Sequence, residues 1–222
     1  MTGIVDYGVG NLFSLRSSFS VIGVETPVSG DPDVIRSWDK IILPGVGAFG
    51  DAADKLRACG LTELLREEAA KGKPILGICL GMQLLLEKSY EYGEHQGLGL
   101  IPGTVEPIAP KLPADYKVPH IGWNALHFPA GKPVSPIFKH IKEGDYGYFV
   151  HSYSGCNCSE SVIATTEYGA ELTAAVGRDN VFGCQFHPEK SGEVGLKILR
   201  AFCDLLIALK ISLFHIHERP QK

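Results

Sequence analysis

Cys79 stands in a short motif that is typical of a nucleophile carried on a sharp turn. The motif, Gly77-x-Cys79-x-Gly81, lies between an apolar strand candidate and a stretch with the apolar spacing of a helix. A Cβ at either glycine would clash where the strand and the helix cross. The start of that helix offers N–H groups and a positive dipole end, which favour a thiolate. We predict that Cys79 is a nucleophile and that the Leu80 N–H donates to an oxyanion.

His187 and Glu189 could supply the base and the carboxylate that a catalytic thiol needs. A thiol nucleophile requires a base within hydrogen-bond reach, and an imidazole requires an acceptor that fixes its tautomer. Pro188 separates the two residues, and we expect an extended segment from which both side chains leave on the same side. A His-Pro-Glu sequence by itself is more often a surface turn. Together with the Cys79 turn it predicts a Cys-His-Glu triad.

The glycine-rich segment 45–50 has two interpretations. It matches Gly-x-Gly-x-x-Gly, the pattern of a dinucleotide-binding turn. However, Pro44 interrupts the junction with the preceding strand, and the acidic residues about 20 positions further on fall inside a predicted helix. We favour a backbone loop beside Cys79 in which the N–H of Val46 or Gly47 donates to a developing oxyanion. The flanking glycines would let the Val46 peptide change orientation.

Strands and helices alternate through the first half of the chain. Candidate strands are 3–5, 24–28, 40–43 and 74–78, and candidate helices are 11–22, 51–71 and 80–88. Such alternation predicts right-handed crossovers and a mostly parallel sheet that is covered by helices on both faces. We therefore expect a three-layer, flavodoxin-like α/β fold.

The second half is richer in glycine, proline and aromatic residues. Its strand candidates are 98–102, 146–153, 162–166, 174–177 and 182–186, followed by a helix over 193–213. Their spacing predicts antiparallel strands that are added to the sheet. No linker is visible, so we expect a single domain over 1–213 and a frayed tail over 214–222.

Composition excludes several classes of protein. The 222 residues are 45% hydrophobic and 21% charged, with a net charge of −4, which is typical of a globular domain and not of a nucleic-acid-binding surface. No stretch reaches the roughly 18 apolar residues of a membrane span, and no signal-peptide pattern is visible. The six cysteines are too sparse for a disulfide scaffold. We expect a cytoplasmic protein that binds neither nucleic acid nor membrane.

Neither a metal nor a cofactor is expected from the sequence. Cys156 and Cys158 are the only closely spaced cysteines. They have no further His or Cys residues at the spacing of a metal site. We interpret the pair as structural.

Several motifs, taken in order, resemble a known family. Gly-Ile-Cys-Leu-Gly-Met-Gln at 77–83, with His-Pro-Glu at 187–189, resembles the triad glutamine amidotransferases. Five blocks bring the resemblance closer to the glutaminase subunits of imidazole glycerol phosphate synthases. These blocks are DYGVGNL (6–12), PGVGAF (44–49), GWN (122–124), YFVHSY (148–153) and FHPEKS (186–191). The resemblance covers about residues 3–207.

The resemblance implies a reaction and a set of residues. Cys79 would attack the carboxamide of glutamine to give a thioester, His187 would relay the proton to ammonia, and Glu189 would orient His187. No cofactor is implied. The residues implied to hold glutamine are Gly45, Gln83, Glu91, His151, Ser152 and Tyr153.

The resemblance also implies a partner. Ammonia would pass to a separate cyclase subunit, a (β/α)₈ barrel, in a heterodimer that makes imidazole glycerol phosphate and an aminoimidazole carboxamide ribotide. The chain is too short to contain such a barrel itself. Trp123, Asn124 and Lys190 match the interface residues of the family.

Three other functions stay open at this point. The chain could be a glutaminase of the same fold that serves another synthase, such as one for anthranilate or pyridoxal phosphate. It could also be a stand-alone thiol hydrolase, or a subunit that keeps the fold without catalysis. The blocks at 6–12 and 186–191 favour the resemblance to a glutaminase subunit of imidazole glycerol phosphate synthase. The intact triad argues against a non-catalytic role.

Overall fold

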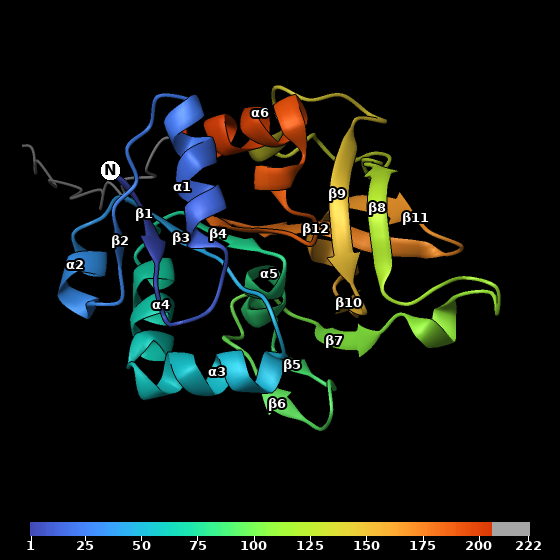
Figure 1. Cartoon of the computed structure of the whole chain (residues 1–222), viewed down its shortest axis with the longest axis horizontal. Helices are drawn as coiled ribbons and strands as arrows, with labels where there is room; N and C mark the ends of the chain where they lie inside the picture. Colours follow the sequence, from blue (N-terminus) through green and yellow to red (C-terminus); the bar gives the residue numbers. More distant parts are fainter. Residues whose placement is uncertain (206–222) are drawn as a thin grey trace, which may run out of the picture.

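Seven strands form a central sheet in the order β11-β12-β13-β4-β3-β1-β2 in this computed structural model, which describes residues 1–205 (Figure 1). Their bounds are β1 Thr2–Val5, β2 Val28–Ser29, β3 Lys40–Leu43, β4 Ile75–Ile78, β11 Val162–Glu167, β12 Glu171–Arg178 and β13 Val181–Cys184. The neighbouring strands from β2 to β13 pair in parallel, whereas β12 pairs antiparallel with both β13 and β11. The expected parallel sheet with added antiparallel strands is therefore confirmed, except that the strand expected over 182–186 is β13, which runs parallel to β4.

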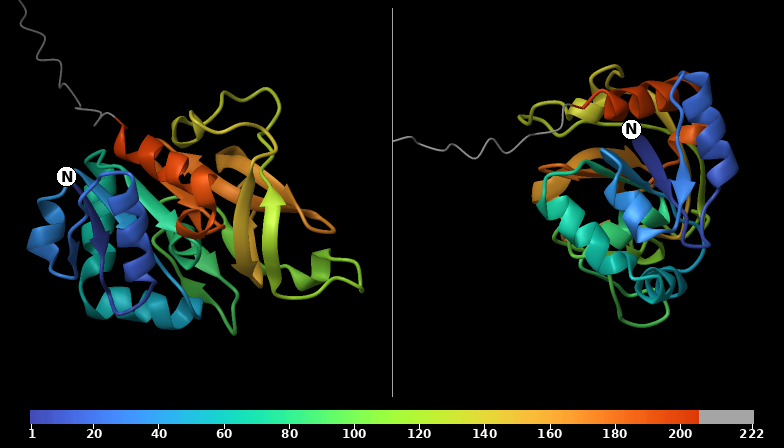
Figure 2. Two further views of the ribbon diagram at one scale, coloured as in Figure 1. Left: turned by 45° about the horizontal axis from the view of Figure 1, so that its top comes forward. Right: turned by 90° about the vertical axis from the view of Figure 1, so that its left-hand side faces the viewer.

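Helices cover both faces of this sheet (Figure 2). One face carries α1 and α6, and the other carries α3, α4 and α5, while the short α2 lies near the β2 edge. The bounds are α1 Leu12–Val21, α2 Pro32–Arg36, α3 Phe49–Ala58, α4 Leu61–Ala70, α5 Leu80–Leu85 and α6 Gly192–Cys203. The result is the three-layer α/β arrangement that the alternation predicted.

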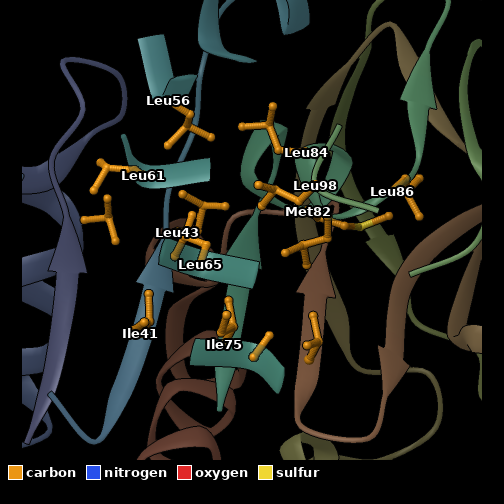
Figure 3. Packing of buried hydrophobic residues seen from close by; sticks show 14 of the residues in the cluster. Ile41, Leu43, Leu56, Leu61, Leu65, Ile75, Met82, Leu84, Leu86 and Leu98 are labelled. Atoms are coloured by element: carbon orange, nitrogen blue, oxygen red, sulfur yellow. The ribbon is translucent and has the colours of Figure 1, made fainter. Parts of the chain in front are cut away.

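Alternate residues of the central strands point into two separate apolar cores. Ile41 and Ile75 join the core beneath α3, α4 and α5 (Figure 3). Ile42 and Leu76 join the core beneath α1 and α6. Because successive side chains of a strand leave on opposite faces, a strand buried on both faces needs apolar residues at every position. This requirement explains why 40–43 and 74–78 could be recognised as strands.

Two smaller sheets lie outside the central sheet. A four-stranded sheet has the order β10-β7-β5-β6, and β8 pairs with β9 in antiparallel fashion. Their bounds are β5 Lys88–Ser89, β6 His95–Gln96, β7 Thr104–Pro107, β8 His120–Ala125, β9 Tyr146–His151 and β10 Tyr153–Cys156. Figure 1 shows the β8–β9 pair beside β11 and β12. Of the six strands, only β9 falls on a predicted one, the candidate 146–153, whereas β10 shares only Tyr153 with it.

Three predicted elements are wrong around α5. The helix expected over 51–71 is two helices, because Gly60 between α3 and α4 has a left-handed φ of +69°. The helix expected over 80–88 ends at Leu85. The strand expected over 98–102 is instead a bent segment whose N–H groups donate to the last carbonyls of α5, as in Leu98 N to Leu84 O at 2.8 Å. A segment distant in sequence therefore caps the helix.

Two further boundaries differ from the expectation. The strand expected over 24–28 is reduced to β2, which begins at Val28. Helix α6 ends at Cys203, where the expectation ran to 213. Residues 206–213 of that expected helix, and the expected frayed tail 214–222, lie outside the described residues.

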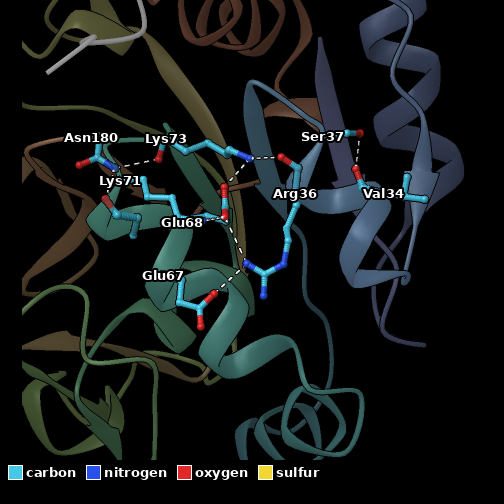
Figure 4. A network of polar contacts seen from close by, with 9 residues as sticks. Val34, Arg36, Ser37, Glu67, Glu68, Lys71, Lys73 and Asn180 are labelled. Atoms are coloured by element: carbon cyan, nitrogen blue, oxygen red, sulfur yellow. Dashed lines mark hydrogen bonds and ion pairs between the residues drawn. The ribbon is translucent and has the colours of Figure 1, made fainter. Parts of the chain in front are cut away.

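A buried carboxylate ties α4 to its neighbours (Figure 4). Glu68 is 3% exposed and forms ion pairs with Lys71 at 2.7 Å, with Lys73, and with Arg36 at 3.5 Å. Burial opposes its charge, but the hydrogen bonds to the two lysines prevail and lower the pKa of Glu68. The network fixes α2, α4 and the approach to β4 together. In the described part of the chain, no helix has the length and apolarity to cross a membrane.

Candidate active site

The turn between β4 and α5 holds Cys79 in a strained conformation. Its φ of 55° and ψ of −113° are rarely adopted by a residue with a side chain. A Cβ on Gly81 would lie 1.9 Å from the Leu43 carbonyl oxygen, and one on Gly77 would lie 2.6 Å from the Gly81 carbonyl oxygen. Both glycines are therefore required by close backbone approach, as the motif predicted. The Cys79 N–H donates to the Cys184 carbonyl at 2.7 Å, which ties the turn to β13.

His187 and Glu189 follow β13 and contact each other directly. The ring nitrogen Nδ1 of His187 lies 2.8 Å from Oε1 of Glu189, and the side chains are 4% and 2% exposed. The predicted extended conformation is wrong, because Pro188–Lys190 is a turn of 3₁₀-helix. Proline fits the first position of such a turn, and its carbonyl accepts from the Ser191 N–H at 3.0 Å. The predicted contact between imidazole and carboxylate nevertheless forms.

The surroundings of His187 favour its charged form. Burial opposes the imidazolium, but hydrogen bonds to Cys79 and Glu189 outweigh burial and raise the pKa of His187 to about 9. The other carboxylate oxygen of Glu189, Oε2, is buried and has no hydrogen-bond partner among the described residues. A buried carboxylate with one free oxygen is stabilised by a cation beside it. The three side chains thus form a thiol–imidazole–carboxylate row.

The thiol and the imidazole open into a cavity of about 330 Å³, which we call the Cys79 pocket. Its lining includes most of the residues predicted from the sequence: Val46, Gly47, Cys79, Leu80, Gln83, Glu91, His151, Ser152, Tyr153 and His187. Pro119 and Val150 line it as well and were not predicted. Leu80 opens α5, where an N–H has no acceptor within the helix. The pocket therefore brings together a thiol, an imidazole, the start of α5 and the glycine-rich segment.

Gly45 does not line the Cys79 pocket but packs against the turn that carries Cys79. A Cβ on Gly45 would lie 2.8 Å from the Gly81 nitrogen, so the loop packs directly on the nucleophile turn. The Tyr7 hydroxyl donates to the Pro44 carbonyl at 2.8 Å. Burial, and the nearby Cys79, raise the pKa of Tyr7. Tyr7 thus anchors the loop as a neutral donor, a role that no local sequence pattern indicates.

Two glutamine side chains form a hydrogen-bonded pair next to Cys79. Gln83 is 5% exposed, and its Nε2 donates to the Tyr153 carbonyl at 3.1 Å and to Gln185 Oε1 at 2.9 Å. Gln185 in turn directs Nε2 toward the Cys79 sulfur at 3.8 Å. Gln185 was missed in the sequence, although it adjoins the His187 motif. The amides connect α5, β10 and the end of β13.

Glu91 has a structural contact besides its place in the pocket. Its carboxylate accepts from the Phe49 N–H at 2.6 Å, and Phe49 is the first residue of α3. A carboxylate at a helix N-terminus is stabilised by the free N–H groups and the dipole there. Glu91 therefore links the loop that follows β5 to the glycine-rich segment before α3.

The three predicted interface residues differ in exposure. Trp123 is 61% exposed on β8, and its ring lies 4.7 Å from that of Tyr148. Lys190 is exposed and lies over the Tyr148 ring, with Nζ 5.8 Å from the centroid. Asn124 is instead half-buried, and both atoms of its amide bond within the chain. Two of the three side chains are thus available on an outer aromatic surface, and the third is directed inward.

A larger cavity of about 570 Å³, which we call the Cys156 cavity, shares no lining residue with the Cys79 pocket. Cys156 and Cys158 both line it, and the Lys111 ammonium lies 2.7 Å from the Cys156 sulfur. Burial raises the pKa of the Cys156 thiol despite this lysine. Within residues 1–205 no group of three or more His, Cys, Asp or Glu residues has the arrangement of a metal site.

The chain is similar in sequence to proteins of a known family. Residues 4–205 match the family described as Glutamine amidotransferase class-I. A protein of Sulfurimonas denitrificans named imidazole glycerol phosphate synthase subunit HisH is 51% identical over 204 residues, which cover 91% of this chain and 97% of that protein. The protein of the same name from Aquifex aeolicus is 49% identical, with 90% and 95% covered.

Solved structures share the fold at much lower identity. A structure described as a glutamine amidotransferase has a TM-score of 0.70 at 19% identity, covering 90% of this chain and 96% of that one. PurLQS from Thermotoga maritima has a TM-score of 0.69 at 21% identity, with 91% and 96% covered. At these identities the likeness establishes the fold alone.

Proposed function

The chain belongs to the class-I glutamine amidotransferases, and within them to the family of HisH subunits of imidazole glycerol phosphate synthase, and from this membership we propose that it hydrolyses glutamine to glutamate and ammonia at Cys79. The observation that carries the proposal is the row formed by Cys79, His187 and Glu189 at one wall of a pocket. An electrophilic carbonyl that enters the pocket meets a thiol with its base and the orienter of that base.

The first half of the proposed reaction forms a thioester. The Cys79 thiol gives its proton to His187 as its sulfur attacks the side-chain carbonyl carbon of glutamine. His187 then gives that proton to the leaving nitrogen as the C–N bond breaks. The raised pKa of His187 suits this step because the imidazolium holds the proton until the leaving nitrogen takes it. In the second half His187 takes a proton from the water that attacks the thioester, and the C–S bond breaks to release glutamate as the proton returns to the Cys79 sulfur. Glu189 holds the Nδ1–H tautomer throughout.

The oxyanion of both tetrahedral intermediates needs backbone donors. We assign this role to the N–H of Leu80 and to an N–H at Val46 or Gly47, since all three residues line the pocket beside Cys79. Gly47 has a φ of +95° with open space at its Cβ position. The Val46 side chain is exposed as well, so neither residue is held by a buried side chain.

The far end of the pocket is proposed to hold the amino-acid end of glutamine. Glu91 supplies a carboxylate for an ammonium group, and the backbone at His151, Ser152 and Tyr153 forms the opposite wall. Gln83 secures that wall through the Tyr153 carbonyl. The cavity volume of about 330 Å³ accommodates a small amino acid and not a peptide.

We further propose that ammonia passes to a separate cyclase subunit of the (β/α)₈-barrel type. There it would enter the synthesis of imidazole glycerol phosphate and an aminoimidazole carboxamide ribotide. The support is the family membership and the exposed aromatic surface of Trp123 and Tyr148 with Lys190 beside it. Such aromatic and cationic side chains are favoured at protein interfaces.

The test measures glutamate release from glutamine by the purified chain, alone and with a barrel cyclase and its ligand. We expect weak release alone, an increase of at least about 100-fold in the complex, and loss of both in Cys79→Ala. Release that persists in Cys79→Ala would overturn the assigned nucleophile. Full activity without a partner would instead indicate a stand-alone hydrolase.

A further inference from the structure

His120 and His151 form a buried imidazole pair behind the Cys79 pocket. They are 0% and 6% exposed, and Nδ1 of His120 lies 3.0 Å from Nε2 of His151. The His120 ring is stacked between Phe149 and Tyr168, with ring centroids 5.0 and 4.0 Å away. Only His151 lines the pocket. The His120 side chain therefore reaches the pocket through its contact with His151.

The outer contacts of the pair determine where its protons lie. Asn124 Nδ2 donates to the Glu167 carbonyl at 2.8 Å, so Asn124 Oδ1 faces Nε2 of His120, also at 2.8 Å. An amide oxygen only accepts, so Nε2 of His120 carries a proton. At the other end the Tyr153 carbonyl accepts from Nδ1 of His151 at 2.8 Å. Each ring is thus a donor at its outer nitrogen.

This assignment leaves the contact between the rings without a proton. A neutral imidazole has one N–H, and each ring has used its proton on an outer acceptor. The two nitrogens that remain, 3.0 Å apart, are both acceptors. Three contacts need three protons, whereas two neutral rings supply two. One added proton completes the row from Glu167 to Tyr153.

We propose that His120 and Asn124 are positioning residues of the proposed glutamine pocket, and that the row Asn124–His120–His151–Tyr153 holds the pocket wall firmly only when it takes up one proton beyond those of two neutral rings. The proposal rests on the proposed function only for the identity of the ligand. It assigns Asn124 an inward role, whereas its family resemblance predicted an outward one.

The groups that face the pair decide when the proton is taken up. Burial lowers the pKa of His120, and burial lowers the pKa of His151 to about 4, with the neighbouring His187 acting in the same direction. Across the pocket stand the Cys79 thiol and the Glu91 carboxylate, and Tyr168 covers the outer ring. At neutral pH the contact between the two rings therefore lacks a proton, and acidification supplies the proton that completes the hydrogen-bonded row. His187 keeps its proton over this whole range, since its pKa is raised to about 9.

The first test observes the protons directly in the free chain, without glutamine. Long-range ¹H–¹⁵N spectra of ¹⁵N-histidine-labelled protein are recorded from pH 8 to pH 4.5. We expect Nε2–H on His120 and Nδ1–H on His151 at pH 8, and both rings should begin to shift together at the acidic end of this range, because the pKa of His151 is lowered to about 4. The opposite tautomer on either ring, or independent titration of the two, would overturn the proposal. Ile121→Ala, an exposed neighbour on β8, is the matched control and leaves the spectra of the pair unchanged.

The second test uses two substitutions of His120, one that keeps a hydrogen-bond donor toward His151 and one that keeps the stacked ring without a donor. An Asn side chain carries an amide N–H near the position of Nδ1, so His120→Asn donates to His151 without an added proton. His120→Phe keeps the stacked ring and cannot donate. We expect the KM for glutamine to fall about threefold from pH 8 to pH 4.5 in the unchanged chain.

The same KM should be low and independent of pH in His120→Asn, and high and independent of pH in His120→Phe, with kcat within about twofold in each. Equal pH dependence in all three proteins would refute the positioning role. If the chain releases no glutamate at all, the proposed function fails, while the spectra still decide the proton count.

Discussion

The molecule holds two cavities that each contain a buried thiol beside a basic side chain. Cys79 meets His187 in the smaller pocket, and Cys156 meets Lys111 in the larger cavity. The two cysteines are equally exposed, at 8% each. Exposure and a neighbouring cation therefore do not distinguish them.

The two sites differ in the backbone conformation at the cysteine and in whether a further residue holds the basic side chain in place. Cys79 sits on a strained turn with φ of 55° at the start of α5, whereas Cys156 is the last residue of strand β10. His187 is held by Glu189, so its position and tautomer are fixed. Burial still raises the pKa of Cys156 with Lys111 beside it. We infer that a reactive thiol in this molecule needs an oriented base and a turn that presents the sulfur, and not merely a nearby positive charge.

The largest expected effect is in alkylation by iodoacetamide at pH 7.5. Cys79 should react about 1,000-fold faster than Cys156, because burial raises the pKa of the Cys156 thiol, whereas Cys79 stands on a strained turn beside His187. Peptide mapping of partially labelled protein measures both sites in one sample. The exposed Cys59 serves as the internal reference for an ordinary thiol. Similar rates at Cys79 and Cys156 would break the comparison.

A smaller effect is expected when the orienter is removed. Glu189→Gln keeps the size of the side chain but loses the carboxylate that fixes the His187 tautomer, so kcat for glutamate release should fall about 100- to 1,000-fold. Steady-state kinetics of the complex with the cyclase measure this loss. Lys111→Met is the matched control at the other cavity and should change kcat less than about twofold. A loss of similar size in both variants would show that folding, and not the triad, had been disturbed.

The smallest effect concerns stability against pH. The pKa of His187 is raised from 6.5 to about 9 on folding, so the folded chain binds this proton more tightly than the unfolded chain. Its stabilisation is therefore fully present below pH 6.5 and is lost as the pH rises through about 9, by at most about 3 kcal/mol. Urea unfolding between pH 6 and 10 measures this slope. It should flatten in His187→Gln and persist in Lys111→Met.

The parts of the fold that the sequence predicted are those specified by short-range patterns. The Cys79 turn was visible because both glycines are required by backbone contacts of 1.9 and 2.6 Å at their missing Cβ atoms. The strands β3 and β4 were visible because burial on both faces demands continuous apolar residues. Even the His187–Glu189 contact was predicted, although through the wrong local conformation.

The parts that could not be predicted depend on contacts between distant segments. Leu98 lies in a bend and not a strand because its N–H meets a carbonyl of α5. Tyr7 supports the loop at Pro44 through a single hydrogen bond across 37 residues. The inward orientation of Asn124 follows from its contacts with His120 and Glu167, which belong to different strands. No local pattern carries such information.

The position of β13 between β4 and β12 has a consequence for the synthesis of this chain. Strand β4, which leads to Cys79, leaves the ribosome about 100 residues before β13. Strand β13 covers the open side of β4 and leads to His187. At about 5–20 residues per second this interval lasts roughly 5–20 s. During that time the apolar strand Ile75–Ile78 is an unpaired sheet edge, which is a site for aggregation and for chaperones. The thiol is likewise made well before its base, so a nascent chain carries Cys79 without the means to use it.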